Sequence, residues 1–87
     1  MNLTGQVING EFDSERNEFT LQQIKHFDTQ STLNERQLDS LHKYLTNHTT
    51  DPDGQVLTLY DQLPVRLSQT EIKDLIHDLE KIKSMYQ

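Results

Sequence analysis

The C-terminal segment most constrains the fold, because it has the pattern of one amphipathic helix. Apolar residues recur there every three or four positions and form one stripe, which consists of Ile72, Leu75, Ile76, Leu79, Ile82 and Tyr86. Ser68 and Glu71 form a Ser-x-x-Glu capping box, which satisfies two amide donors at a helix start. Lys81 and Lys83 would lie near the negative end of the helix dipole. We therefore expect a helix over 69–86 that covers another apolar layer.

A second amphipathic helix is expected earlier in the chain. Thr32 and Glu35 have the same capping-box spacing, and the helix that they open would run to about Thr46. Its apolar stripe consists of Leu38, Leu41 and Leu45, with Leu33 and Tyr44 beside them. This stripe is narrower than that of the last helix, so we expect the helix to pack on one side only. The segment 47–54, NHTTDPDG, would end this helix, because a helix interior does not tolerate Pro52.

The N-terminal segment 7–21, VINGEFDSERNEFTL, offers two places for the chain to reverse. Asn9-Gly10 is a strong two-residue hairpin signal, but a turn there would pair LTGQVI with EFDSER, which has only one apolar residue. A reversal at Ser14–Asn17 would instead join two strands that both carry apolar side chains. We therefore expect a hairpin with the later turn.

This later turn fixes the register of the two strands. It places Phe12 opposite Phe19 and Gly10 opposite Leu21, with Ile8 on the same face, and a one-residue slip would destroy this arrangement. Gly10 then becomes a strand glycine at a bulge. The acidic residues of the segment are expected on the outward face or in the loop, namely Glu11, Asp13 and Glu15.

A further strand is expected between the two helices. Gln55–Tyr60 (QVLTLY) has strand composition, and Leu63–Leu67 (LPVRL) could extend it beyond a kink. Pro64 restricts that second piece to an edge or a strand end, because proline donates no ladder hydrogen bond. The chain is thus predicted to be an α+β single domain over 1–87. We expect the order β-β-α-β-α, with an antiparallel sheet of about three strands and two helices packed on one face.

Composition excludes several classes of protein. The chain has 87 residues, no cysteine and a net charge of −6. Absence of cysteine excludes a disulfide scaffold, a thiolate metal site and a cysteine nucleophile. The acidic balance disfavours non-specific binding to nucleic acid or anionic membranes. No stretch resembles a signal peptide or a membrane span, so a cytoplasmic protein is expected.

One segment has part of the pattern of a calcium site. Residues 49–60 resemble an EF-hand loop in the spacing of Asp51, Asp53 and Gly54. That resemblance implies acidic oxygens at both ends of the loop, where this chain has Thr49 and a tyrosine. Proline also interrupts the segment, and a strand is expected after it. We interpret the segment as an Asp-Pro-Asp-Gly turn.

No constellation of residues indicates catalysis or a bound cofactor. The histidines lack the i, i+4 spacing of a helical zinc site and are expected to be exposed; they are His26, His42, His48 and His77. The three glycines form no phosphate-binding motif, and the carboxylates follow no catalytic pattern. We therefore expect a protein that is not an enzyme and has neither a metal nor a cofactor.

Two segments partly match nucleic-acid-binding families. Residues 63–82 combine a short alternating strand with a capped helix, carried by Val65, Arg66, Leu67 and Ser68. This segment resembles the start of ribbon-helix-helix repressors, which implies a dimer that inserts paired strands into the DNA major groove. Residues 33–45 resemble the opening helix of winged-helix domains, which implies a basic recognition helix further along. No basic helix follows, so DNA binding is an alternative rather than the main prediction.

The remaining candidate is an acidic surface. Four carboxylates are expected around the hairpin tip, from Glu11, Asp13, Glu15 and Glu18. Asp74 and Asp78 would add a like-charged i, i+4 pair on the last helix. The sequence predicts a non-enzymatic protein-binding module, a small acidic regulator or inhibitor whose partner has a basic surface. The alternatives are a nucleic-acid-mimicking inhibitor and a dimeric DNA-binding regulator, and exposed strand edges also allow a homodimer.

Overall fold

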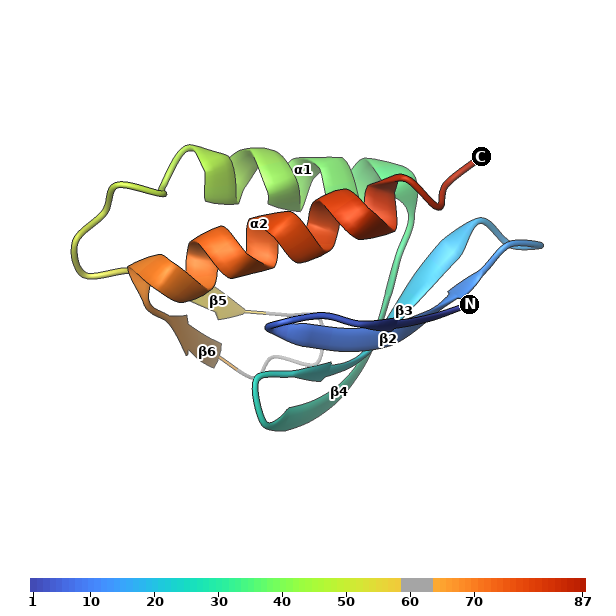
Figure 1. Cartoon of the computed structure of the whole chain (residues 1–87), viewed down its shortest axis with the longest axis horizontal. Coiled ribbons are helices and arrows are strands. Elements are labelled where there is room, and N and C mark those ends of the chain that lie inside the picture. The colour runs from blue at the N-terminus through green and yellow to red at the C-terminus, as the bar shows by residue number, and fades with distance from the viewer. Residues whose placement is uncertain (59–63) are drawn as a thin grey trace.

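Two helices lie side by side over a layer of strands in the computed structural model, which describes residues 1–58 and 64–87 (Figure 1). The helices are α1 (Glu35–Thr46) and α2 (Gln69–Lys83), and they run in opposite directions. The strands are β1 (Asn2–Thr4), β2 (Ile8–Asp13), β3 (Glu18–Ile24), β4 (Phe27–Leu33), β5 (Gln55–Thr58) and β6 (Pro64–Leu67). Within the described ranges, neither helix is long and apolar enough to cross a membrane.

The strands form two antiparallel sheets. One sheet has the order β1-β2-β3-β4, and the other consists of β5 and β6. The predicted α+β class and the alternation of strands and helices are confirmed. The main sheet has four strands rather than about three. The additional strands β1 and β4 are polar in sequence, and they pair through their main chains at the two edges of the predicted hairpin.

The predicted hairpin and its register are confirmed. Phe12 pairs with Phe19 and Gly10 pairs with Leu21, and the register shifts between Asn9 and Gly10 as a bulge requires. A side chain at Gly10 would collide with the Phe19 ring and the backbone of β3. Asn17 closes the turn with a positive φ of 56°. The chain therefore reverses at the later of the two candidate turns.

The core lies between the helices and the inner face of the sheets. Phe12 and Phe19 from the hairpin are almost completely buried, with 2% and 0% of their surface exposed. The predicted stripe of α2 packs on this face, and its buried members are Ile72, Leu75, Ile76, Leu79 and Ile82. Burial of such side chains contributes about 1.5–3 kcal/mol each, so this layer supplies most of the driving force for folding.

The start of α1 differs from the prediction. Asn34, rather than Thr32, is the N-cap, and its capping box is completed by Gln37 instead of Glu35. Thr32 is still part of β4, where it pairs with Thr20, so it cannot cap the helix.

The capping box of α2 is as predicted. The Ser68 hydroxyl accepts a hydrogen bond from the Glu71 amide at 3.1 Å, and the Glu71 carboxylate accepts one from the Ser68 amide at 2.9 Å. The helix itself ends at Lys83 rather than at residue 86. Its last predicted turn is replaced by a tail that packs on the hairpin.

Between the helices, β5 and β6 pair as antiparallel strands. β6 turns back on β5, with Leu57 opposite Val65 and Val56 opposite Arg66, instead of continuing the same strand beyond a kink. The predicted strand ends at Leu59 and Tyr60, and the start of its extension at Leu63, lie outside the described residues.

The first part of the segment 49–60, up to Gly54, is a turn, and β5 follows it. Gly54 has a positive φ of 72°, which favours glycine. The Asp51 carboxylate contacts His48 Nδ1 at 2.7 Å and accepts from Gln55 Nε2 at 2.6 Å. These local contacts close the loop between α1 and β5.

Candidate interaction face

The outer face of the four-stranded sheet is polar and acidic. Alternate residues of its strands point away from the helices, as in any antiparallel sheet with one solvated face. Strands β1 to β4 contain no lysine or arginine, whereas their carboxylates are Glu11, Asp13, Glu18 and Asp28. Within the strands this face therefore carries charge of one sign, and Arg16 in the β2–β3 turn adds a cation at its end.

The four predicted site residues lie together at the tip of the β2–β3 hairpin. Glu11 and Asp13 are exposed on the same face of β2, and Glu15 is exposed in the turn. Glu18 is half-buried and lies directly opposite Asp13. A shallow concavity of about 460 Å³ lies on this face, and its lining includes Glu11, Asp13, Glu15, Thr20 and Gln22. We refer to the residues Glu11, Asp13, Glu15 and Glu18 as the acidic tip.

The acidic tip has an electrostatic cost. Like charges directly opposite one another on neighbouring strands are destabilising, and Asp13 and Glu18 form such a pair. Part of that repulsion is offset because Asp13 Oδ1 accepts from the amides of Glu15 and Arg16 at 3.0 and 3.2 Å. Arg16 also approaches the Asp13 carboxylate at 4.0 Å. Asp13 thus shapes the turn as well as contributing charge.

A C-terminal tail holds the hairpin from the inner side. Tyr86 packs edge-on against Phe12 with ring centroids 4.9 Å apart, and its hydroxyl donates to the Leu33 carbonyl at 2.7 Å. Burial raises the pKa of Tyr86 to about 12. The Asn17 side chain exchanges two hydrogen bonds with the Gln87 main chain, at 2.9 and 3.2 Å. These contacts fix the acidic tip against the helix layer.

Asp78 is not on the surface, contrary to the predicted outward pair with Asp74. Its side chain is completely buried, and its carboxylate accepts hydrogen bonds from the amides of Gln6, Val7 and Ile8 at 3.0, 2.8 and 3.2 Å. Asp74 is only half-buried. Asp78 therefore joins α2 to the β1–β2 turn instead of repelling a neighbour.

The position of Asp78 in the sequence of the last helix already indicated that its side chain is buried. Asp78 lies three residues after Leu75 and four before Ile82, so it is on the apolar stripe itself. A charge at such a position must be paired or hydrogen-bonded, because burying an unpaired charge is costly. The partner could not be read from the sequence, since it is the main chain of a distant turn.

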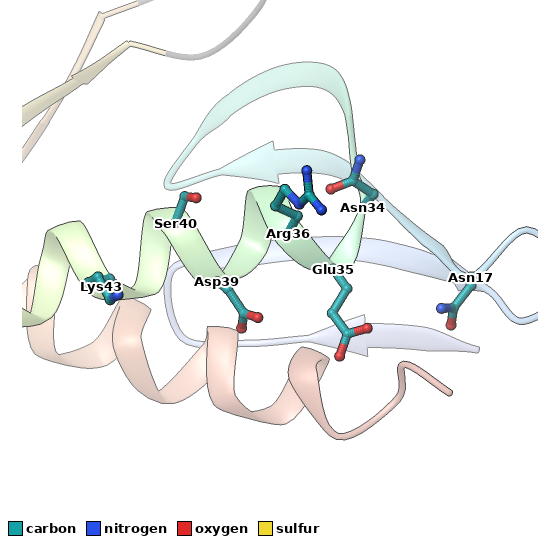
Figure 2. A pocket seen from close by; sticks show the side chains of 7 residues that line it. All are labelled: Asn17, Asn34, Glu35, Arg36, Asp39, Ser40 and Lys43. Carbon is teal, nitrogen blue, oxygen red and sulfur yellow. The ribbon is translucent and has the colours of Figure 1, made fainter.

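A second groove, of about 640 Å³, lies beside α1 and has mixed charge. Figure 2 shows Glu35 and Asp39 directed toward α2, while Arg36 and Ser40 lie on another side of the helix. The Asp39 carboxylate pairs with Lys83 of α2 at 3.0 Å. Opposite charges in one groove partly cancel, so this groove is a weaker candidate than the acidic tip.

The histidines do not converge on one another. His42 contacts Glu80 at 3.2 Å across the two helices, and His48 contacts Asp51 within the loop after α1. His26 and His77 are exposed. Among the residues that the structure describes, no group of three or more histidine or carboxylate side chains is arranged to hold a metal ion.

The chain was compared with known protein families, curated proteins and solved structures. No family, no curated protein and no solved structure matches it.

Proposed function

We propose that this chain is a non-enzymatic protein-binding module whose acidic tip contacts a basic surface of another protein. The observation that carries this proposal is the charge of the outer sheet face. Carboxylates gather at one end of four strands that contain no lysine or arginine. Such a surface attracts Arg and Lys side chains and speeds their encounter with the protein.

The rigidity of the hairpin supports the proposal. The acidic tip is held by the Asn17–Gln87 hydrogen bonds and by the packing of Tyr86 on Phe12. A partner that binds a fixed array of charges loses less conformational freedom than one that must order a loop. The repulsion between Asp13 and Glu18 would also decrease when a cation lies between them.

A regulator or inhibitor is the role that best fits such a module. Such a module would act on its partner by covering part of that partner's surface. A more specific form of the same proposal is an inhibitor that imitates nucleic acid and covers the DNA-binding site of another protein. Both versions use the same carboxylates, and they differ only in the partner.

A DNA-binding dimer has weaker support. The ribbon-helix-helix resemblance implies a strand whose ribbon is formed with a second copy, whereas β6 forms its ribbon with β5 of the same chain. The outer face of the main sheet also lacks the cations that phosphate contacts require. Arg66 is exposed, but it is the only cation in β6.

Charge reversal tests the proposal. Glu11→Lys with Glu15→Lys should abolish binding to a lysine-rich peptide and to partners captured from a cell lysate, while leaving the fold intact because both residues are exposed. Asp53→Lys with Glu80→Lys is the matched control, since it makes the same change in net charge at exposed positions elsewhere, although it also removes the Glu80 contact with His42. Equal binding by the two double variants would mean that net charge, and not the acidic tip, is responsible.

A further inference from the structure

The edge of β1 has free hydrogen-bonding groups beside the acidic face. Met1 exchanges hydrogen bonds with Phe12, and the Gly5 amide donates to the Ile8 carbonyl. In an antiparallel pair the bonded positions alternate, so the main chains of Asn2 and Thr4 point away from β2. By this alternation both residues lie outside the β1–β2 hydrogen-bond ladder, and no turn, loop or cap hydrogen bond among the described residues uses their main chains. The edge therefore offers its N–H and C=O groups to another strand.

The opposite edge of the sheet is less suited to this role. The pairing of β3 with β4 is irregular between Leu21 and Gln23, and such an irregularity twists an edge away from further pairing. The β1–β2 register, by contrast, has no irregularity. The β1–β2 turn is also held by the three hydrogen bonds to Asp78, so the β1 edge is rigid before anything binds to it.

We infer that the basic partner docks as an added strand on the edge of β1, with basic side chains over the outer face and apolar side chains over the inner face. This inference rests on the proposed function and specifies how the partner binds. Strand addition obtains affinity from main-chain hydrogen bonds and specificity from alternate side chains.

The outer face favours a basic occupant. Asn2 lies opposite Glu11, so an added strand would place an outward side chain two strand spacings, about 10 Å, from Glu11. A lysine or arginine side chain extended toward the glutamate can close that gap across the short side chain of Asn2. A second copy of this chain is disfavoured, because it would bring a second acidic face beside the first.

The inner face favours an apolar neighbour at alternate positions. Met1 has 64% of its surface exposed, although Leu3, two residues later on the same face, is buried. An added strand would cover Met1 with its inward side chains and remove that apolar surface from water. The expected occupant is therefore an extended segment in which basic and apolar residues alternate.

The test uses a short peptide of alternating lysine and valine and compares two protein variants. Thr4→Pro removes an edge N–H that points away from β2, so the sheet should persist while strand addition is blocked. We expect Thr4→Pro to weaken binding at least about tenfold, the effect of losing one or two hydrogen bonds. Glu11→Lys with Glu15→Lys should also weaken it. Amide exchange should become slower at Asn2 and Thr4 when the peptide binds.

A second set of peptides tests strand docking on the unchanged protein, so the result does not depend on whether the Thr4→Pro variant folds. Methylation of the peptide amides that face β1 should abolish binding to the unchanged protein, whereas methylation of the alternate amides should not. Suppose that the charge-reversed protein loses binding, while the Thr4→Pro protein binds the peptide normally and the unchanged protein binds both methylated peptides normally. Strand docking would then be wrong, but the proposal that the acidic tip binds a basic partner would still be supported. If the unchanged protein binds no basic peptide, both proposals fail. A concentration-dependent dimer that Thr4→Pro dissociates would show that a second copy occupies the edge.

Discussion

The carboxylate of Asp78 and the amide of Val7 are joined by a 2.8 Å hydrogen bond that links the last helix to the first turn of the chain. Two further amides, of Gln6 and Ile8, donate to the same buried carboxylate. The β1–β2 turn and α2 are thus joined at one point. The stability of this junction bears on function, because the acidic tip keeps its shape only while the sheet and the helices stay packed together.

Removal of the Asp78 carboxylate should destabilise the protein strongly. Asp78→Ala leaves three main-chain donors without their acceptor, so we expect a loss of about 3 kcal/mol or more in the free energy of unfolding. Asp78→Asn should cost less, because the amide retains one acceptor oxygen. Urea denaturation measures both changes. Asp74→Ala, four residues earlier and only half-buried, is the control and should change stability by less than about 1 kcal/mol.

A side chain at Gly5 should disturb the same contact. A Cβ atom on Gly5 would lie 2.6 Å from the carboxylate oxygens of Asp78, closer than van der Waals contact allows. We expect Gly5→Ala to cost about 1–3 kcal/mol. In a double-mutant cycle with Asp78→Ala the two losses should be less than additive, since the clash disappears with the carboxylate. Strict additivity would contradict the packing described for this turn.

Ionisation of Tyr86 should destabilise the fold at alkaline pH. Its pKa is raised to about 12 in the folded protein by burial, against about 10 in an unfolded chain. The folded state therefore holds its proton more tightly, so stability is complete below pH 10 and decreases as the pH rises from 10 toward 12. In the Tyr86→Phe protein most of this alkaline decrease in the free energy of unfolding should be absent. Denaturation measured at several pH values between 10 and 12 checks this. An unchanged profile in the phenylalanine variant would disprove the assignment.

The start of α2 should be sensitive to acid. The Ser68 amide, which donates to the Glu71 carboxylate, lowers the pKa of that group, and the ion pair with Lys25 at 3.1 Å acts in the same direction. A lowered pKa means that this stabilisation is present above the unfolded value and decreases as the pH falls through the folded one. Glu71→Gln should flatten this part of the stability profile. Ser68→Ala should cost about 1 kcal/mol at neutral pH through the lost cap.

Much of the fold follows from sequence periodicity. The hairpin register could be predicted because Phe12, Phe19 and Leu21 share a face in only one alignment, and α2 because its stripe and capping box agree. β4 could not be predicted, because its sequence FDTQSTL has few apolar residues. No turn signal marks its ends, so the segment cannot be distinguished from a loop. Thr32 has the spacing of a helix cap, yet it is the penultimate residue of that strand.

The acidic tip was partly visible in the sequence. Its four carboxylates are close in the chain, and the hairpin necessarily gathers them once the turn is placed. The contacts that hold the tip were not visible, because Asn17–Gln87 and Tyr86–Phe12 join opposite ends of the chain. The sequence of β1 likewise does not indicate that Asn2 and Thr4 form a strand edge beside the acidic tip.

Residue-by-residue NMR titration with a lysine-rich peptide tests most directly whether the acidic tip is the binding surface. We predict that the largest amide shifts occur at Glu11, Asp13, Glu15 and Glu18, and that these shifts vanish in the Glu11→Lys, Glu15→Lys protein. Shifts concentrated instead at Arg36 and along the groove beside α1, or spread evenly over the surface, would contradict the claim.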